Sequence, residues 1–291
     1  MDLPALLLGT LLLRPYVFVF MAAFLFCSIR LLGWRRTGLF FVVTWFTAFV
    51  CEASSIRTGI PFGWYFYTNS TTDRELFIFG VPFFDSLSFS FLLYASYCLA
   101  LFYLLPARGN HDAEPVNLFR RHTWPALLFS SRIRTSWPVL KLTVLFFTFI
   151  DIIIDPVALR GERWFLGQIY YYPEPGVYYG VPLANFVGWA VVGLLALSAY
   201  FLLDRQLSPA RGHRDGDHTV MTGNVLLGVG LYYGVLAFNL GVTFWIGEAQ
   251  LGLTGLLIFL PLTALLILRL LGRLSPPSHV QPQGSGVPSN P

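Results

Sequence analysis

The chain has 291 residues, of which 55% are hydrophobic and only 12% are charged, and its mean hydropathy is +0.63. Soluble domains carry about twice that share of charged residues, so the composition excludes a soluble globular protein and indicates an integral membrane protein. The net charge of +4 is then explained by topology and by contact with anionic lipid, and no nucleic acid partner is expected.

Seven apolar runs are long enough to cross a hydrocarbon core, which needs about 20 residues per helix. They are Tyr16–Leu32, Leu39–Ile56, Val81–Leu105, Val139–Asp155, Val181–Leu203, Val220–Ile246 and Leu251–Leu271. A further run, Leu3–Leu13, is too short to span and is expected to be an interfacial segment that stops at Arg14-Pro15. The sequence therefore predicts an all-α polytopic membrane helix bundle with about seven transmembrane helices. We expect one domain over residues 1–271 and a disordered cytoplasmic tail over residues 272–291.

Basic residues predict the orientation of this bundle. With seven spans and the amino terminus outside, fourteen of the 19 Lys and Arg residues lie on one side. The positive-inside rule places that side in the cytoplasm. We therefore expect a multi-pass protein of the plasma or inner membrane, with the basic loops and the tail cytoplasmic.

The first two spans are joined by a short basic turn, Leu32 to Arg36, which predicts a tight hairpin. Glu52 lies about one turn from the outer end of the second span. A carboxylate at that depth costs several kcal/mol unless it is paired, protonated or facing a cavity, so it is a candidate catalytic residue. The structural alternative is an ion pair with Arg57.

The first outer loop, Arg57 to Gly80, is rich in aromatic residues. Trp64, Tyr65 and Tyr67 are candidate substrate-binding residues, although an aromatic belt at the membrane interface accounts for part of this loop. Asp85 follows at the start of the third span. It is a candidate catalytic acid, and equally it is an acid that suits the positive end of a helix dipole.

The fourth span ends in two carboxylates, Asp151 and Asp155, followed by Pro156, which is expected to stop the helix. A spacing of four residues puts both carboxylates on one helix face. Two acids so close together inside a membrane cannot both ionise cheaply, so one is expected to hold its proton. We consider this the most specific chemical signal in the chain.

The second outer loop and the fifth span repeat the features of the first loop and third span. TGIPFGWYFYT and FGVPFFD in the first copy correspond to GQIYYYP and YGVPLAN in the second. Asp85 and Asn185 occupy the same place after Gly-Val-Pro. Such self-similarity indicates a duplicated unit, here a parallel repeat of spans two and three in spans four and five. The second copy adds Trp164, Tyr170, Tyr172, Asn185 and Trp189 as candidate substrate-binding residues.

The remaining residues exclude several kinds of site. Cys27, Cys51 and Cys98 have no paired spacing and are expected to be buried without a disulfide or a metal. All five histidines fall in predicted cytoplasmic segments or the tail, which excludes a histidine-clustered di-iron site. No dinucleotide or P-loop motif is visible, so we expect neither a cofactor nor a metal. The glycines of the sixth span, Gly228, Gly230, Gly234 and Gly241, predict close helix packing.

At Glu52, TGIPFG, Gly-Val-Pro, Asp155-Pro156 and YYGVPLANFVGW, the chain resembles the CruF-type carotenoid hydratases of the carotenoid biosynthesis protein family. The resemblance covers about Leu39 to Leu203 and, in arrangement, the rest. It implies a cofactor-independent hydro-lyase that adds water to the terminal C1=C2 double bond of an acyclic ψ-end, as in γ-carotene or lycopene. Its partners would be the carotenoid, the lipid bilayer and other membrane enzymes of the pathway.

Hydration requires an acid that protonates C2 and a second carboxylate that orients the attacking water at C1. Our hypothesis is that Asp155 or Asp151 is the acid and that Glu52 holds the water. Asp85 and Asn185 would complete the polar pocket, and the loop aromatics would stabilise the tertiary cation.

Three other readings remain open at this stage. A lycopene-type cyclase also begins by protonating C2 but must exclude water. A transporter would use ionisable residues near the membrane midplane, whereas these acids lie near one face. A non-catalytic carotenoid-binding protein would keep working without the acids.

Overall fold

The computed structural model describes residues 3–68, 70–106, 126–207 and 219–271. The disordered tail predicted for residues 272–291 lies outside the described residues. In the described part, seven helices are long and apolar enough to cross a membrane, which confirms the seven predicted spans and the all-α class. They are α2 (Pro15–Leu32), α3 (Trp34–Thr58), α4 (Phe83–Leu104), α6 (Trp137–Ala158), α7 (Leu183–Leu207), α8 (Thr222–Trp245) and α9 (Ala249–Leu270). The chain is therefore a multi-pass membrane protein.

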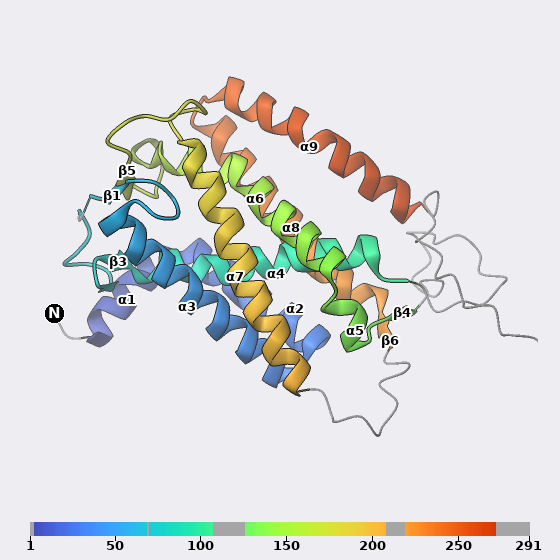
Figure 1. The fold of residues 1–291 in the computed structure, drawn as a ribbon. Helices are drawn as coiled ribbons and strands as arrows, with labels where there is room; N and C mark the ends of the chain where they lie inside the picture. The colour runs from blue at the N-terminus through green and yellow to red at the C-terminus, as the bar shows by residue number, and fades with distance from the viewer. Residues whose placement is uncertain (1–2, 69, 107–125, 208–218, 272–291) are drawn as a thin grey trace, which may run out of the picture.

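Short elements gather at the two ends of the bundle (Figure 1). One end carries α1 (Leu3–Leu13), β1 (Phe66–Tyr67), β2 (Phe77–Ile78), β3 (Val81–Pro82), β5 (Tyr170–Tyr171) and the 3₁₀ turn Gly161–Arg163. We call it the loop end. The other end carries β4 (Ala126–Leu128), α5 (Ser131–Arg134) and β6 (Thr219–Met221). The β2–β3 and β4–β6 pairs are antiparallel, and so is the β1–β5 pair, which joins the two long loops.

Two predicted helix boundaries are wrong. The turn between α2 and α3 is Gly33 alone, whose φ of 79° suits glycine, and Arg35 and Arg36 are already helical. Pro156 does not stop α6 at once, because the helix runs on to Ala158. A proline this close to a helix end removes a single intrahelical bond, and the amide of Leu159 still reaches the carbonyl of Asp155 at 2.9 Å.

Four helices form a ring that contains the duplicated unit. Helix α3 packs against α4 and α7, and α6 packs against the same two helices. The hairpin α3–α4 thus corresponds to α6–α7. The connecting loop of each hairpin has the same strained backbone conformation immediately before its Gly-Val-Pro sequence. Phe79 and Tyr179 have φ values of 47° and 49°, and each is followed by a glycine of positive φ, a region that bulky residues rarely adopt. The two copies predicted from the sequence therefore fold alike.

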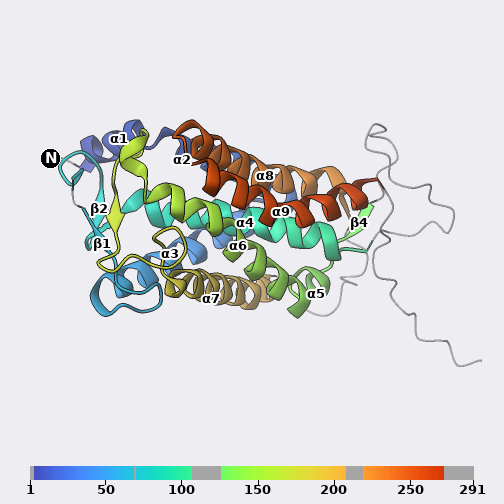
Figure 2. The ribbon, with the colours of Figure 1, turned by 90° about the horizontal axis from the view of Figure 1, so that it is seen from above.

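Helix α4 is the centre of the bundle (Figure 2), with α3 and α7 on one side and α2, α8 and α9 on the other. In its most apolar stretch 83% of the residues are buried, against 28% in α9, whose leucines are left to face lipid. Of the four glycines of α8, Gly228 brings α8 close to α4, because a Cβ there would overlap the thiol of Cys98. Gly230, Gly234 and Gly241 face open space, so for them the packing prediction is wrong.

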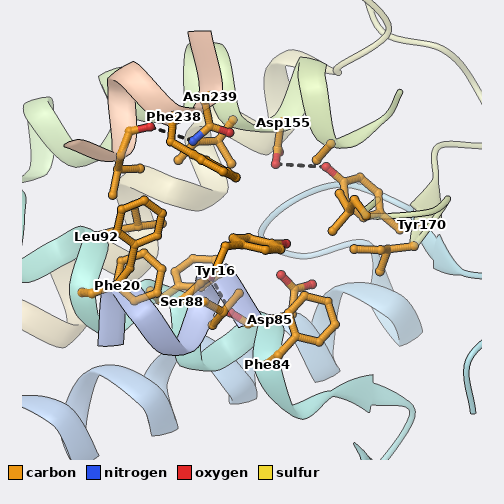
Figure 3. A pocket seen from close by; sticks show the side chains of 18 of the residues that line it. Tyr16, Phe20, Phe84, Asp85, Ser88, Leu92, Asp155, Tyr170, Phe238 and Asn239 are labelled. Carbon is orange, nitrogen blue, oxygen red and sulfur yellow. Dashed lines mark hydrogen bonds between the residues drawn. The ribbon is translucent and has the colours of Figure 1, made fainter. Parts of the chain in front are cut away.

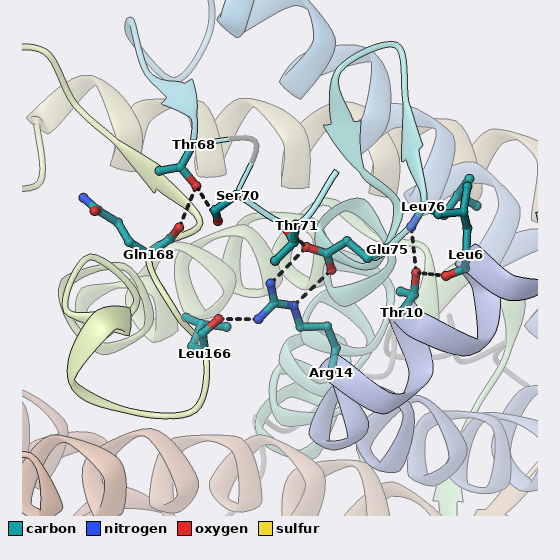
Figure 4. A network of polar contacts seen from close by, with 10 residues as sticks. All are labelled: Leu6, Thr10, Arg14, Thr68, Ser70, Thr71, Glu75, Leu76, Leu166 and Gln168. Carbon is teal, nitrogen blue, oxygen red and sulfur yellow. Dashed lines mark hydrogen bonds and ion pairs between the residues drawn. The ribbon is translucent and has the colours of Figure 1, made fainter. Parts of the chain in front are cut away.

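Arg14, between α1 and α2, is a buried anchor for both long loops (Figure 4). Its guanidinium donates to both carboxylate oxygens of Glu75, at 3.1 and 3.0 Å, and to the carbonyl of Leu166. The hydroxyl of Thr10, in α1, accepts a 2.8 Å bond from the amide of Leu76. Helix α1 does end before Arg14-Pro15, as predicted, and its end is fixed to the loops by buried polar contacts.

We expect Arg14→Met to destabilise the protein strongly, because it leaves Glu75 buried without its cation. Breaking such a pair costs about 3–5 kcal/mol of unfolding free energy. Thermal unfolding in detergent micelles measures the effect, and Arg14→Met with Glu75→Gln should recover part of the loss. The matched control is Asp73→Asn in the same loop, an exposed acid whose replacement should change stability by about 0.5 kcal/mol or less. Equal unfolding midpoints for Arg14→Met and Asp73→Asn would contradict the anchor.

Candidate functional site

Four buried carboxyl groups lie at the loop end of the four-helix ring. Glu52 comes from α3, six residues before the helix ends, and Asp85 from the first turn of α4. Asp151 and Asp155 come from the last two turns of α6. Because buried acids need hydrogen-bond donors to offset lost hydration, the partners of these four groups define the site.

Each half of the repeat supplies a tyrosine for one aspartate. The hydroxyl of Tyr67 donates to Asp85 at 2.7 Å, and that of Tyr170 donates to Asp155 at 3.0 Å. Tyr67 and Tyr170 face each other in the β1–β5 pair. Burial, with the nearby carboxylates adding to it, raises the pKa of both tyrosines well above the usual value. Both hydroxyls therefore stay protonated and act as donors.

The other two acids have donors on neighbouring helices. Ser86, next to Asp85 on α4, donates to Glu52. The amide of Asn185, on α7, donates to Asp151 at 2.8 Å and also to Asp155. Asp151 and Asp155 thus point the same way, as their spacing predicts. The predicted alternative of a Glu52–Arg57 ion pair is not seen, since Arg57 donates to the carbonyls of Ala53 and Phe79 instead.

A small polar cavity of about 40 Å³ lies among these groups. It is lined by Glu52, Phe62, Tyr65, Asp85, Phe89, Asp155, Tyr170, Tyr172, Asn185 and Trp189. This volume is enough for at least one water molecule, and the lining offers several polar partners for it. We call it the polar cavity.

A second cavity, of about 100 Å³, adjoins the first and is mostly apolar. Its walls come from α2, α4, α6, α7, α8 and the second long loop, which contributes Trp164. They include Tyr16, Phe20, Phe84, Phe238 and Asn239 (Figure 3). Five residues line both cavities, namely Asp85, Phe89, Asp155, Tyr170 and Trp189. Two carboxyl groups therefore stand where a water-sized polar space meets an apolar one. We call the second space the apolar cavity.

The structure brings most of the sequence-predicted residues together. Tyr65, Tyr172, Asn185 and Trp189 line the polar cavity with three of the acids, and Trp164 lines the apolar cavity. Asp151 lines neither cavity and reaches the site through Asn185. Trp64 is 52% exposed and stacks on Phe66, outside both cavities.

Several residues of the site were not predicted from the sequence. Ser86 gave no signal beyond its place beside Asp85. Tyr16 is the second residue of α2, where a tyrosine is ordinary at a membrane interface. Asn239 is a buried polar residue within α8, and an intramembrane amide is a signal that could have found it.

No group of three or more His, Cys, Asp or Glu side chains in the described ranges is arranged to hold a metal ion. The three cysteines are buried and free. A polar space bounded by acids, an amide and tyrosines can bind water and transfer protons. The apolar space beside it can hold a hydrocarbon.

The sequence matches one family model, described as "Carotenoid biosynthesis protein", over residues 8–260. This range includes both copies of the repeat and every residue of the two cavities. No curated protein and no solved structure matches the chain.

We expect Tyr67→Phe and Tyr170→Phe each to lower stability, because each removes the hydroxyl that donates to a buried aspartate. Losing a hydrogen bond of this kind costs about 1–3 kcal/mol. Thermal unfolding in detergent checks this, and Tyr171→Phe is the control, since Tyr171 lies in the same strand with an exposed side chain. If all three variants unfolded at the same temperature, the tyrosine–aspartate hydrogen bonds would not contribute to the stability of the folded protein.

Proposed function

Because the chain belongs to the family of carotenoid biosynthesis proteins, we propose that it is a hydratase acting on an acyclic carotenoid end. It adds water across the terminal C1=C2 double bond of a ψ-end, as in lycopene or γ-carotene, and gives a tertiary 1-hydroxyl. The observation that carries the proposal is the junction of the two cavities. Asp85 and Asp155 line both the space suited to water and the space suited to hydrocarbon.

The apolar cavity is suited to the end of a polyene. Its walls present aromatic rings on several sides, among them Phe89, which stacks on Trp189 with ring centroids 4.7 Å apart. A carotenoid is a rod about as long as the hydrocarbon core, roughly 30 Å. If its chain runs along the bundle, its end reaches the loop end of the protein, where the acids lie.

Asp155 is the acid in this proposal. It borders the apolar cavity, whereas Asp151 does not. Its carboxyl proton goes to C2, the π electrons of C1=C2 form the new C–H bond, and C1 becomes a tertiary cation. Aromatic faces stabilise such a cation by about 0.5–2 kcal/mol each, and Phe89 and Trp189 line both cavities.

Glu52 is the group that holds the water. It lines the polar cavity but not the apolar one, so it is on the water side of the junction. The water oxygen bonds to C1 while one water proton goes to Glu52, and the product has gained one H₂O. A proton then returns from Glu52 to Asp155 through the polar cavity that both line, which restores the starting state.

The remaining polar groups position the two acids. Tyr170 and Asn185 hold Asp155 through the bonds described above. Asp151 accepts a bond from the amide of Asn185. Asp85, which accepts a bond from Tyr67, completes the wall of the polar cavity. No cofactor takes part in the proposed reaction.

We further infer that the loop end faces outward and that the membrane is the plasma or inner membrane. Basic residues concentrate at the opposite ends of the spans, which the positive-inside rule assigns to the cytoplasm. A carotenoid end held at the loop end would then react close to an interface that supplies water. A reporter protein fused to the carboxyl terminus tests the orientation, and an extracellular reporter would contradict it.

Expression in bacteria that make lycopene or γ-carotene tests the reaction. We expect a new pigment heavier by one water, with an unshortened chromophore. Growth in H₂¹⁸O should label the hydroxyl oxygen, and conversion of preformed pigment by isolated membranes in D₂O should place one deuterium at C2. A product of unchanged mass with a shortened chromophore would instead indicate a cyclase. Unchanged pigment in both hosts would contradict the proposal.

Asp155→Asn and Glu52→Gln test the two roles. General acid–base groups contribute about 10²–10⁴-fold, so we expect each variant to lower hydration at least 100-fold. The matched control is Glu162→Gln, an exposed acid at the same end of the bundle, which should keep full turnover. Full turnover in both Asp155→Asn and Glu52→Gln, with equal amounts of protein in the membrane, would contradict the assignment.

A further inference from the structure

Tyr16 stands between the carboxyl groups and the rest of the apolar cavity. In Figure 3 its ring extends from the side of Phe20 and Phe238 toward Asp85 and Asp155, with the hydroxyl nearest the acids. The residue lines the apolar cavity but not the polar one. A hydrocarbon that extends from the side of Phe20 and Phe238 toward the acids therefore lies against this ring.

The ring is held firmly in this position. It stacks on Phe238, with centroids 5.4 Å apart and planes at 18°, and meets the edge of Phe165 at 5.6 Å. It also packs against Trp164 at 6.2 Å. On the backbone, Tyr16 follows Pro15 and the buried Arg14–Glu75 ion pair. These contacts restrict the ring to one place, so it acts as a fixed wall.

A fixed wall matters because a C1 cation has more than one fate. Water can attack C1, which gives the hydrated product. Alternatively, the C5=C6 double bond can attack, so that C1 bonds to C6, C5 becomes the cation, and loss of the C6 proton re-forms the double bond with no change in mass. The second route requires the chain end to curl until C6 reaches C1. A narrow cavity that keeps the end extended prevents it.

We propose that Tyr16 is the specificity-determining residue that keeps the carotenoid end extended and so directs the cation to water. The proposal rests on the hydratase function above and adds a residue that decides between hydration and cyclisation. The ring of Tyr16 does this by occupying the space that a curled end would need. Its stacking partner Phe238 supports it from α8.

The test compares pigments from a lycopene-producing host that expresses each full-length variant. Tyr16→Ala should raise the ratio of cyclised to hydrated product at least tenfold over wild type. Tyr16→Phe keeps the ring and should stay within about twofold of wild type, since the wall is unchanged. Phe238→Ala, which removes the stacking partner, should shift the ratio in the same direction by a smaller factor.

The matched control is Tyr233→Ala on α8, which removes a half-buried tyrosine that lines neither cavity and should leave the ratio unchanged. An affinity tag measures the amount of each variant in the membrane. If Tyr16→Ala does not accumulate, Tyr16→Leu and Phe238→Ala decide the matter.

Hydrated product from wild type, with no cyclised product from any of these cavity variants, overturns the role of Tyr16 and leaves the hydratase function standing. A wild-type chain that hydrates nothing overturns the function itself, and the role of Tyr16 with it.

Discussion

The need to supply donors to buried carboxyl groups organises this protein. An acid without a partner inside a bundle in lipid costs several kcal/mol, and each acid here takes its donor from a different element. Glu52 on α3 is bonded by Ser86 on α4, Asp85 by Tyr67 on β1, and Asp155 by Tyr170 on β5. The hydrogen bonds that stabilise the buried carboxyl groups are thus the same bonds that join helices to helices and loops to helices.

The duplication explains where the site lies, and a sequence difference between the two copies explains which chemical groups the site contains. Two similar hairpins, α3–α4 and α6–α7, pack against each other and their loops pair through β1 and β5, so their acids and tyrosines converge at one end of the bundle. Asp85 in the first copy is replaced by Asn185 in the second. The amide supplies donors where a second carboxylate could not, and it bonds both Asp151 and Asp155. The two halves therefore offer different chemical groups, as the proposed division between proton donor and water site requires.

The helices outside the ring add the apolar half of the site. Helices α2 and α8 pack on α4 and on each other, and they bring Tyr16, Phe20 and Phe238 beside acids that belong to the duplicated unit. The anchor at Arg14 sits two residues before Tyr16 and contacts both long loops. The position of α2 is in this way coupled to the loops that carry Tyr67 and Tyr170. The contacts of Arg14 therefore stabilise the walls of both cavities.

The sequence alone determined the membrane class, the seven spans, the repeat and the four acids, because hydropathy, spacing and self-similarity are local properties of the chain. It also placed Asp151 and Asp155 on one face, since helical periodicity relates residues a turn apart. Only the tertiary structure decided which acids border the cavities, that Asp151 reaches the site through Asn185, and that Trp64 lies outside. Likewise, only packing made Tyr16 a wall of the site, because its neighbours Phe238 and Trp164 are far away in sequence. Periodicity describes the faces of one helix, whereas a cavity depends on which faces of several helices meet.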